Sequence, residues 1–309
     1  MNKPQVTVIG GLTMDLTYKV KEWPHPKQAI QASAYYLSPG GKGFNQASAI
    51  SRMGLGVNFI TSVGDDKFAD TAISELQTEN IDNKCVIHQK NTLTDLVTII
   101  IGQDANPSFI GIRNATSKLT VSDIKRFQHL IESSNVLLVN SEVSPTVALE
   151  ALKIAKNANV TTIFNPAPPE KFPIEMLTFT DYFVPNEWEA KKLAGNKSHL
   201  SSSELAKYYH KFGTKVACVT MGENGCVVAT NNSLKSYLAF PIKEVDATGA
   251  GDAFCGTLAY SVSQGWDIHK TIRYASAAGA IACTKIGSRN APTITELTRF
   301  INKNKHVNI

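Results

Sequence analysis

Short runs rich in Val and Ile alternate with segments of helical periodicity along most of the chain. These runs predict buried strands at 6–9, 57–63, 136–139, 160–164, 182–184, 216–220 and 226–229. The apolar spacing between them predicts helices at 43–53, 67–79, 123–131, 145–156, 251–264 and 269–285. This alternation predicts an α/β fold, with a mostly parallel sheet covered by helices on both faces. In such sheets, ligands bind beyond the carboxyl ends of the strands.

Four further strand-like segments fall outside this alternation. Residues 16–20 and 29–37 precede the first predicted helix, which indicates a small sheet set apart from the main one. Residues 96–101 and 108–112 flank the turn-forming residues 104–107 and predict a hairpin. Because no internal repeat or long linker divides the sequence, we expect the whole chain to form one domain.

Composition and charge narrow the class of protein. Hydrophobic residues make up 43% and charged residues 18% of the 309, which is typical of a globular protein and argues against disorder. The formal net charge of +5 is spread along the chain and is too small to indicate nucleic-acid binding. A small anionic ligand needs no greater charge than this.

Cysteine spacing and the N-terminal sequence bear on the cellular compartment. The five cysteines contain no CxxC pair and are widely spaced, which argues against a disulfide framework or a zinc site. Free buried thiols instead indicate a reducing compartment. There is no signal-peptide pattern at the N-terminus, and no apolar run approaches the ~20 residues needed to span a bilayer. We therefore expect a cytoplasmic protein that contacts neither membrane nor nucleic acid.

The strongest candidate for chemistry is the sequence VDATGAGDAF at 245–254. A β-like stretch is expected to end at Val245, followed by a glycine-rich turn and a helix. Backbone N–H groups converge at such a helix start and suit a phosphate group. Asp252 lies among these donors, where a carboxylate can take a proton from a hydroxyl that attacks phosphorus. The alternative is that Asp252 only complements the helix dipole.

Three other segments each have a functional and a purely structural interpretation. In SPGGKGFNQA at 38–47, which is not a Walker A loop, Lys42 and Asn45 can donate hydrogen bonds to a polyol, or the segment is a plain loop. In NEWE at 186–189, Asn186 and Glu189 form a helix-capping pair or a water-mediated magnesium or phosphate site. The segment TMGENG at 220–225 lies between two predicted strands and is a hairpin turn or a ligand contact.

The order of these motifs, with NPAP at 165–168 between them, resembles the ribokinase family of sugar kinases, the PfkB carbohydrate kinases. The resemblance runs from about residue 6 to about residue 300. It implies a large α/β domain with a small β-sheet lid formed by residues 12–40 and 95–112, and a homodimer that pairs through these lids. It also implies transfer of the ATP γ-phosphate to a hydroxymethyl oxygen.

The resemblance also implies roles for the reacting and sugar-binding groups. Asp252 is implied to be the general base, and the anion hole is implied to consist of the backbone N–H groups of Gly249, Ala250 and Gly251. The implied sugar contacts are Thr13, Asp15, Gly41, Lys42, Asn45 and Glu142.

The nucleotide and cation contacts follow from the same resemblance. Implied ATP contacts are Asn186, Thr220, Gly222, Gly225 and Ser276, with Glu189 assisting Mg²⁺. A loop pair is implied to hold a monovalent cation such as K⁺, largely through backbone oxygens, with Asp246, Thr248, Ala282, Lys285 and Gly287. At Lys285 the carbonyl would serve, because an ammonium group cannot ligate a cation.

Two departures from the family pattern bear on the substrate and the cation. Thr13 stands where ribokinases usually carry Asn, and Ala291 stands where they often carry a Ser that ligates the cation. Ribose is the expected substrate, and the alternatives are fructose, a phosphosugar, adenosine or pseudouridine. A phosphosugar would need cationic contacts beyond Lys42, and Arg113 is the candidate next to the lid.

Two other classes of protein fit the sequence less well than a kinase. A sugar-binding regulator without catalysis is disfavoured because Asp252 and the glycine-rich turn are both intact. A dinucleotide oxidoreductase is disfavoured because Gly10-Gly11-Leu12 does not form a GxGxxG fingerprint.

Overall fold

The computed structural model describes residues 5–102, 107–305 and 307, and its main sheet has nine strands within these residues. Their order is β13-β12-β11-β10-β9-β8-β1-β4-β5. The strands from β5 to β11 pair in parallel, and β12 and β13 form an antiparallel edge. The bounds are β1 Gln5–Ile9, β4 Gly56–Val63, β5 Val86–His88, β8 Val136–Asn140, β9 Thr161–Asn165, β10 Tyr182–Phe183, β11 Val216–Thr220, β12 Cys226–Thr230 and β13 Ser233–Tyr237.

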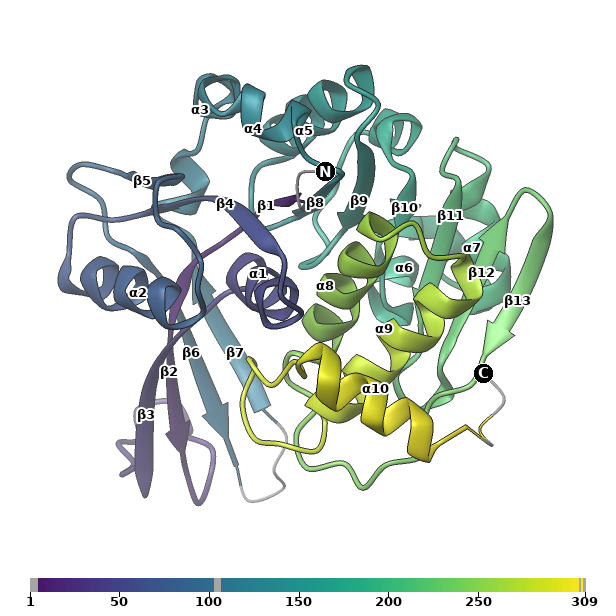
Figure 1. The fold of residues 1–309 in the computed structure, drawn as a ribbon. Helices are drawn as coiled ribbons and strands as arrows, with labels where there is room; N and C mark the ends of the chain where they lie inside the picture. The colour runs from purple at the N-terminus through teal and green to yellow at the C-terminus, as the bar shows by residue number, and fades with distance from the viewer. Residues whose placement is uncertain (1–4, 103–106, 306, 308–309) are drawn as a thin grey trace.

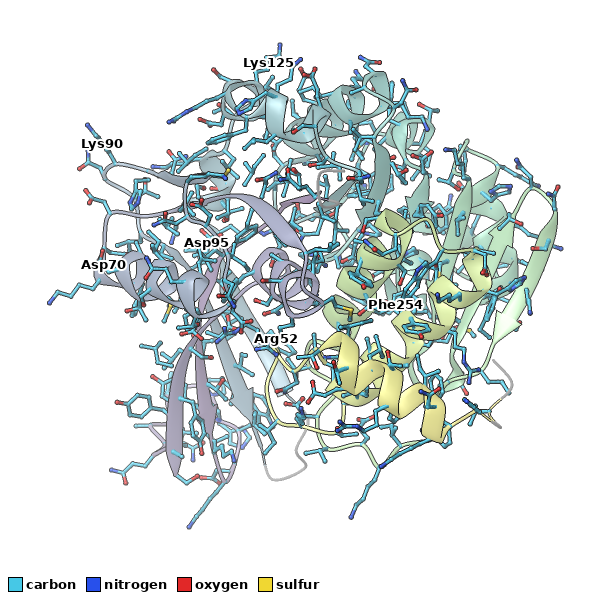
Figure 2. The ribbon with its side chains drawn as sticks, viewed as in Figure 1. Arg52, Asp70, Lys90, Asp95, Lys125 and Phe254 are labelled. Carbon is cyan, nitrogen blue, oxygen red and sulfur yellow. The ribbon has the colours of Figure 1, made fainter. Side chains whose placement is uncertain are left out.

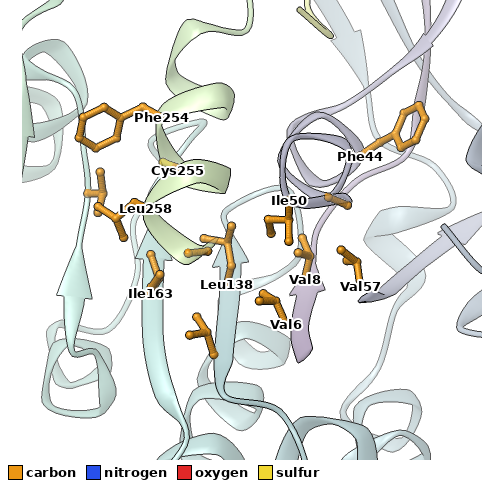
Figure 3. Packing of buried hydrophobic residues seen from close by; sticks show 14 of the residues in the cluster. Val6, Val8, Phe44, Ile50, Val57, Leu138, Ile163, Phe254, Cys255 and Leu258 are labelled. Atoms are coloured by element: carbon orange, nitrogen blue, oxygen red, sulfur yellow. The ribbon is translucent and has the colours of Figure 1, made fainter. Parts of the chain in front are cut away.

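Helices cover both faces of this sheet, as the alternating pattern predicts (Figure 1). Val136 and Leu138 point to one face and Leu137 and Val139 to the other, because side chains alternate along a strand. The first face packs against α1 Lys42–Arg52, α2 Lys67–Thr78, α8 Ala250–Ser263 and α9 Ile268–Ala282. The second packs against α3 Val121–Arg126, α5 Pro145–Asn157, α6 Glu187–Ala194 and α7 Ser202–His210. Figure 3 shows side chains of α1 and α8 packed over the strands of the first face.

A second sheet of four strands projects from one end of the molecule, in the order β3-β2-β6-β7 (Figure 1). Its strands are β2 Thr13–Lys19, β3 Ala34–Gly40, β6 Asp95–Ile101 and β7 Pro107–Ile112. The predicted hairpin is confirmed, since β6 and β7 pair antiparallel, and β2 pairs with β6 in parallel. Of its predicted turn at 104–107, residues 104–106 lie outside the described residues. This sheet exposes large apolar side chains on both outer strands, including Tyr35, Phe109 and Ile110.

Two of the strand predictions are wrong. The strand expected at 29–37 starts at Ala34 and continues to Gly40, because β2 ends at Lys19, which pairs with Ala34. Pro39 is tolerated within β3 because β3 lies at the edge of its sheet. The β-like stretch expected to end at Val245 contains no strand. The backbone N–H groups of Val245 and Asp246 instead donate to the carbonyl of Cys283, beyond the end of α9.

Two predicted helices also differ from the structure. The helix expected at 123–131 is broken at Phe127, whose φ of −103° and ψ of 13° separate α3 from α4 Gln128–Glu132. The helix expected at 269–285 ends at Ala282.

The pattern missed β5, β13, α7 and α10 Ile294–Lys303, although capping boxes mark the start of both helices. Short 3₁₀ turns at Thr116–Lys118, Ile174–Phe179, Gly195–Lys197 and Gly222–Asn224 were also not predicted. Among the described helices, none has the length and apolar character required to cross a membrane.

Candidate active site

A cavity of about 210 Å³ lies at the carboxyl ends of β9 and β11, beside the first turn of α8. Segments far apart in sequence line it, with Lys42, Asn165, Ala167, Val184, Asn186, Glu189, Thr220, Ala247, Gly249, Gly251, Asp252, Phe254 and Cys255. A larger, shallower depression follows one face of α10 and contains none of the predicted site residues. The cavity lies where a parallel sheet is expected to bind its ligands.

The Asp252 side chain is 5% exposed and lines this cavity from α8. Its two carboxylate oxygens accept hydrogen bonds from amides of α1: Oδ2 from Asn45 Nδ2 at 2.9 Å and Oδ1 from Gln46 Nε2 at 3.0 Å. Each carboxylate oxygen has more than one lone pair, so Asp252 can still accept a proton from a ligand in the cavity. The two amides fix the direction in which the carboxylate points.

The helix start beside Asp252 is shaped by Gly249, the N-cap of α8, whose φ is 79°. A Cβ at Gly249 would overlap the carbonyl oxygen of Ser288, so the left-handed conformation and the close approach both require glycine. Within the described residues, the N–H groups of Gly249 and Gly251 have no protein acceptor, whereas that of Ala250 donates to Ala247 O at 3.2 Å. The free donors and the helix dipole make this turn suitable for an anion.

Glu142 binds the start of α1, where its carboxylate accepts three backbone N–H groups. The donors are Gly11 at 2.8 Å and Lys42 and Gly43, each at 2.9 Å. Burial raises the pKa of Glu142, while the hydrogen bonds from Lys42 and Gly43 oppose this rise. Glu142 therefore holds the glycine-rich loop in place, and the sugar contact that the resemblance implies stays a prediction.

Lys42 lines the cavity together with Asp252, Asn186 and Glu189. Burial lowers the pKa of its ammonium group, but the carboxylates of Asp252, Glu142 and Glu189 raise it to above its ordinary value. Lys42 is therefore a cation in the cavity that the expected nucleotide contacts also line, and its contact with the sugar stays a prediction.

Thr13 and Asp15 lie on β2, at the base of the small sheet. The Thr13 hydroxyl donates to Asp15 Oδ1 at 2.8 Å, and both side chains are buried. Burial and the carboxylates of Glu142 and Asp252 raise the pKa of Asp15 to about 6. Asp15 therefore shares one electrostatic environment with Asp252, as expected of residues in one site.

The predicted nucleotide contacts divide into two groups. Asn186 and Glu189 form a capping box at the start of α6, with both hydrogen bonds at 2.8 Å, and Thr220 bridges to Asn186. These three line the cavity. Gly222 and Gly225 instead shape the hairpin turn between β11 and β12, with φ values of 58° and 81°. They do not line the cavity, and neither does the half-buried Ser276 of α9.

The loops predicted to bind a cation lie side by side. Asp246 joins them, because its Oδ1 accepts from Thr248 N and its Oδ2 accepts from Gly287 N, both at 2.9 Å. These hydrogen bonds outweigh the effect of burial and lower the pKa of Asp246. Ala282 ends α9, Lys285 is exposed, and the Ala291 methyl packs in an apolar cluster with Phe240.

Sequence reasoning missed the buried amides that surround Asp252. Gln46 Nε2 also donates to Asn165 Oδ1 at 3.1 Å, and Gln46 Oε1 accepts from Asn140 Nδ2 at 3.3 Å. Asn165 in turn donates to Val184 O at 2.7 Å. Asn140 and Asn165 are the last residues of β8 and β9, so a polar residue at the end of an apolar strand was the available signal.

The chain is similar to known carbohydrate kinases over most of its length. The sequence pattern described as pfkB family carbohydrate kinase matches residues 3–295. Over 97% of this chain, it is 31% identical to the bifunctional ribokinase/ribose-5-phosphate isomerase A of Fructilactobacillus sanfranciscensis, and it spans 57% of that relative's length. It is 28% identical to the ribokinase of Staphylococcus aureus, with 96% of this chain and 99% of the relative covered. The crystal structure of ribokinase from Thermotoga maritima gives a TM-score of 0.89 at 26% identity, covering 97% of this chain and 99% of that one.

Proposed function

The chain belongs to the pfkB family of carbohydrate kinases, and on this premise we propose that it transfers the γ-phosphate of ATP to the hydroxymethyl oxygen of ribose. One observation carries the proposal: Asp252 lines the cavity beside the free N–H groups of the α8 start, with its carboxylate held by Asn45 and Gln46. An acid beside an anion site supplies the two elements that phosphoryl transfer to an alcohol requires.

In the proposed reaction, Asp252 accepts the hydroxyl proton while the sugar oxygen forms a bond to the γ-phosphorus. The bond from that phosphorus to the β-γ bridging oxygen breaks, and ADP leaves with the electron pair. Negative charge spreads over the equatorial oxygens, where the N–H groups of Gly249 and Gly251 and the Lys42 ammonium group stabilise it. We therefore assign Lys42 to the phosphate groups, and not to the sugar.

Asn186, Glu189 and Thr220 are proposed to bind the nucleotide, since all three line the cavity. Glu189 Oε2 accepts from Asn186 N, which leaves Oε1 for a water molecule of a hydrated ion. Within the described ranges, no group of three His, Cys, Asp or Glu side chains is arranged to hold a metal. A single carboxylate with a free oxygen suits an Mg²⁺ ion that keeps most of its waters and arrives with ATP. Such an ion would neutralise charge on the β- and γ-phosphates.

A monovalent cation also fits the donors on the loop pair at 246–248 and 282–287. Carboxylate and carbonyl oxygens are the ligands of hard cations. The hydrogen bonds from Thr248 N and Gly287 N to the Asp246 carboxylate hold the oxygen-bearing backbone of the two loops together. Ala291 contributes no side-chain oxygen. We propose that K⁺ binds this loop pair with one ligand fewer than a serine at this position would provide.

The small sheet is proposed to act as a lid over the sugar and as the contact between two subunits. Its strands fall within residues 12–40 and 95–112, and we propose that residues 1–309 work as one domain with this lid. Tyr35, Tyr36, Phe109, Ile110 and Ile112 are exposed on its outer strands, an apolar surface that suits a homodimer. Light scattering should then give twice the chain mass of 33.5 kDa.

The cysteines support a cytoplasmic location for the kinase. All five are free thiols, and four of them are buried, which suits a reducing compartment.

A coupled assay of ADP production tests the proposal. The panel compares six acceptors at equal concentration: ribose, 2-deoxyribose, fructose, fructose 6-phosphate, adenosine and pseudouridine. The kinase reaction itself should require no nicotinamide cofactor. We expect ribose to give the highest kcat/KM. A second sugar or nucleoside at the top of the panel would replace ribose, and no ADP with any of them would refute the kinase activity. Repeating the assay in Na⁺ and K⁺ salts tests the cation.

A further inference from the structure

Arg52, which Figure 2 labels, is the last residue of α1, and its guanidinium group contacts two parts of the fold. On one side, Nε and Nη2 donate to the two carboxylate oxygens of Glu79, at 2.8 and 2.5 Å. On the other side, Nη1 donates to the backbone carbonyls of Arg289 at 2.5 Å and Ala291 at 3.2 Å. One planar side chain therefore joins the end of α2 to the segment that precedes α10.

The same carboxylate is shared with a second arginine. Arg289 Nη1 lies 3.3 Å from Glu79 Oε1 and 2.9 Å from Glu75 Oε1, and its guanidinium stacks 4.8 Å from the Phe44 ring centroid. The side chains of Glu79 and Arg289 are 9% and 16% exposed, so the pair between them is largely shielded from solvent, whereas those of Arg52 and Glu75 are 30% and 33% exposed. Partly buried, bidentate pairs hold geometry better than exposed ones.

The segment held by Arg52 also touches the start of α8. The carbonyl oxygen of Ser288 occupies the space that a Cβ of Gly249 would take, so backbone meets backbone at the N-cap. One residue earlier, Gly287 N donates to Asp246 Oδ2 at 2.9 Å, which binds the segment to the loop leading into Gly249. Residues 287–291 therefore contact the proposed anion site on one side and Arg52 on the other.

We propose that Arg52 is a positioning residue for phosphoryl transfer, which fixes residues 287–291 and through them the N–H groups at the start of α8. The proposal rests on the kinase function proposed above. Arg52 has no contact with the cavity, so it acts through Ser288 and Gly287 and not on the substrates. A small displacement of donors that stabilise the transition state lowers turnover more than it lowers binding.

Arg52→Gln and Arg52→Lys test this, because glutamine removes the charge and lysine keeps the charge but lacks the planar fork. We expect kcat to fall roughly tenfold to a hundredfold in Arg52→Gln, with KM for ATP and sugar within about threefold of wild type. The kcat of Arg52→Lys should lie between that of the wild type and that of Arg52→Gln. Hydrogen exchange at residues 245–252 should increase in both variants, a measurement that needs no catalytic activity.

Arg273→Gln is the matched control. Arg273 also donates to two backbone carbonyls, Val307 O at 2.8 Å and Asn304 O at 3.2 Å, and stacks on the Phe240 ring, but both of its carbonyl partners lie near the C-terminus. Its kcat should stay near that of wild type.

Equal losses of kcat in Arg52→Gln and Arg273→Gln would overturn the proposal, as would unchanged exchange at 245–252. If Arg52→Gln does not fold, the same criteria apply to Arg52→Lys. Because the exchange measurement does not depend on turnover, inactivity of the wild type towards the whole sugar panel would refute the kinase function separately.

Discussion

Gln46 donates a hydrogen bond from Nε2 to Oδ1 of Asp252 at 3.0 Å, and its side chain is fully buried. The same amide donates to Asn165 and accepts from Asn140, so its hydrogen-bonding groups have protein partners. Residues at the ends of β8 and β9 thus determine, through α1, where the carboxylate of Asp252 points. The orientation of the proposed base therefore depends on residues at the carboxyl ends of β8 and β9.

Gln46→Glu should lower kcat at neutral pH about tenfold or more, because two hydrogen-bonded carboxyl groups share one proton and leave Asp252 unable to accept another. Activity should recover as the pH rises and the shared proton is lost. The measurement is kcat against pH for the variant and the wild type.

Asn58→Asp is the control for this substitution, since Asn58 is also buried and its amide donates to Thr7, remote from the cavity. It should lower stability without moving the pH profile. An unchanged profile in Gln46→Glu would contradict the assigned role of Gln46.

Alanine substitutions at two neighbouring glycines should have different effects. The Gly249→Ala substitution places a Cβ against Ser288 O at a residue with a left-handed backbone conformation. We therefore expect this variant to lose several kcal/mol of stability and also to lose activity. At Gly251 a Cβ meets no protein atom within 4 Å, and alanine in a helix is favourable by about 1 kcal/mol. Gly251→Ala should therefore keep or raise Tm while losing activity, because its methyl group stands where the phosphate approaches. Full activity in Gly251→Ala would show that no ligand comes close to this residue.

Asp15→Asn should raise stability at pH 7.5 and weaken sugar binding. The folded pKa of about 6 lies above the ordinary value of 3.8, so the favourable contribution of the carboxyl group is complete below pH 3.8 and is lost as the pH rises through 6. This rise in pKa corresponds to a cost of about 3 kcal/mol in folding stability when Asp15 is ionised, and the neutral asparagine avoids that cost. Thermal unfolding of both proteins from pH 4 to 8 measures the difference, which should shrink towards pH 4.

The same change at Asp15 should raise KM for the sugar roughly tenfold to a hundredfold, as expected for a lost charged hydrogen bond. In the wild type, KM should rise below pH 6 as Asp15 becomes protonated. A KM that is the same at pH 5 and pH 8 would argue against a contact between Asp15 and the sugar.

The Thr13→Asn substitution restores the residue that ribokinases usually carry at this position and tests how Thr13 affects the choice of sugar. The Thr13 hydroxyl donates to Asp15, whereas an asparagine amide reaches further and offers a second donor. We expect the kcat/KM ratio of ribose over 2-deoxyribose to rise about tenfold. Thr13→Val, which keeps the shape and removes the hydroxyl, is the control and should not raise this ratio.

The sequence pattern predicted the sheet and its covering helices because buried parallel strands leave clear Val- and Ile-rich runs, as at 136–139. It failed where tertiary pairing decides the boundary. The start of β3 depends on where β2 ends, and the segment before Asp246 is held by the carbonyl of Cys283. Neither partner is visible in the local sequence.

Within the site, Gly249 and Gly251 predicted a helix start with free N–H groups, and the structure has such a start beside the cavity. The hydrogen bonds of Glu142 to the start of α1 and the position of Lys42 in the cavity were harder to predict, because both depend on tertiary contacts. Gln46 was missed for a related reason, as an amide within a helix has no distinctive sequence signal until its acid partner from α8 is placed beside it.

The central claim is that Asp252 is the base that activates the sugar hydroxyl, and Asp252→Asn tests it most directly. Asparagine keeps the size of the side chain and one acceptor for the Asn45 and Gln46 amides, but it cannot take a proton at neutral pH. We expect kcat to fall about 10²- to 10⁴-fold. Calorimetric affinities for ribose and for ATP should stay within about threefold of wild type, since neither depends on proton transfer. A variant with wild-type kcat would contradict the claim.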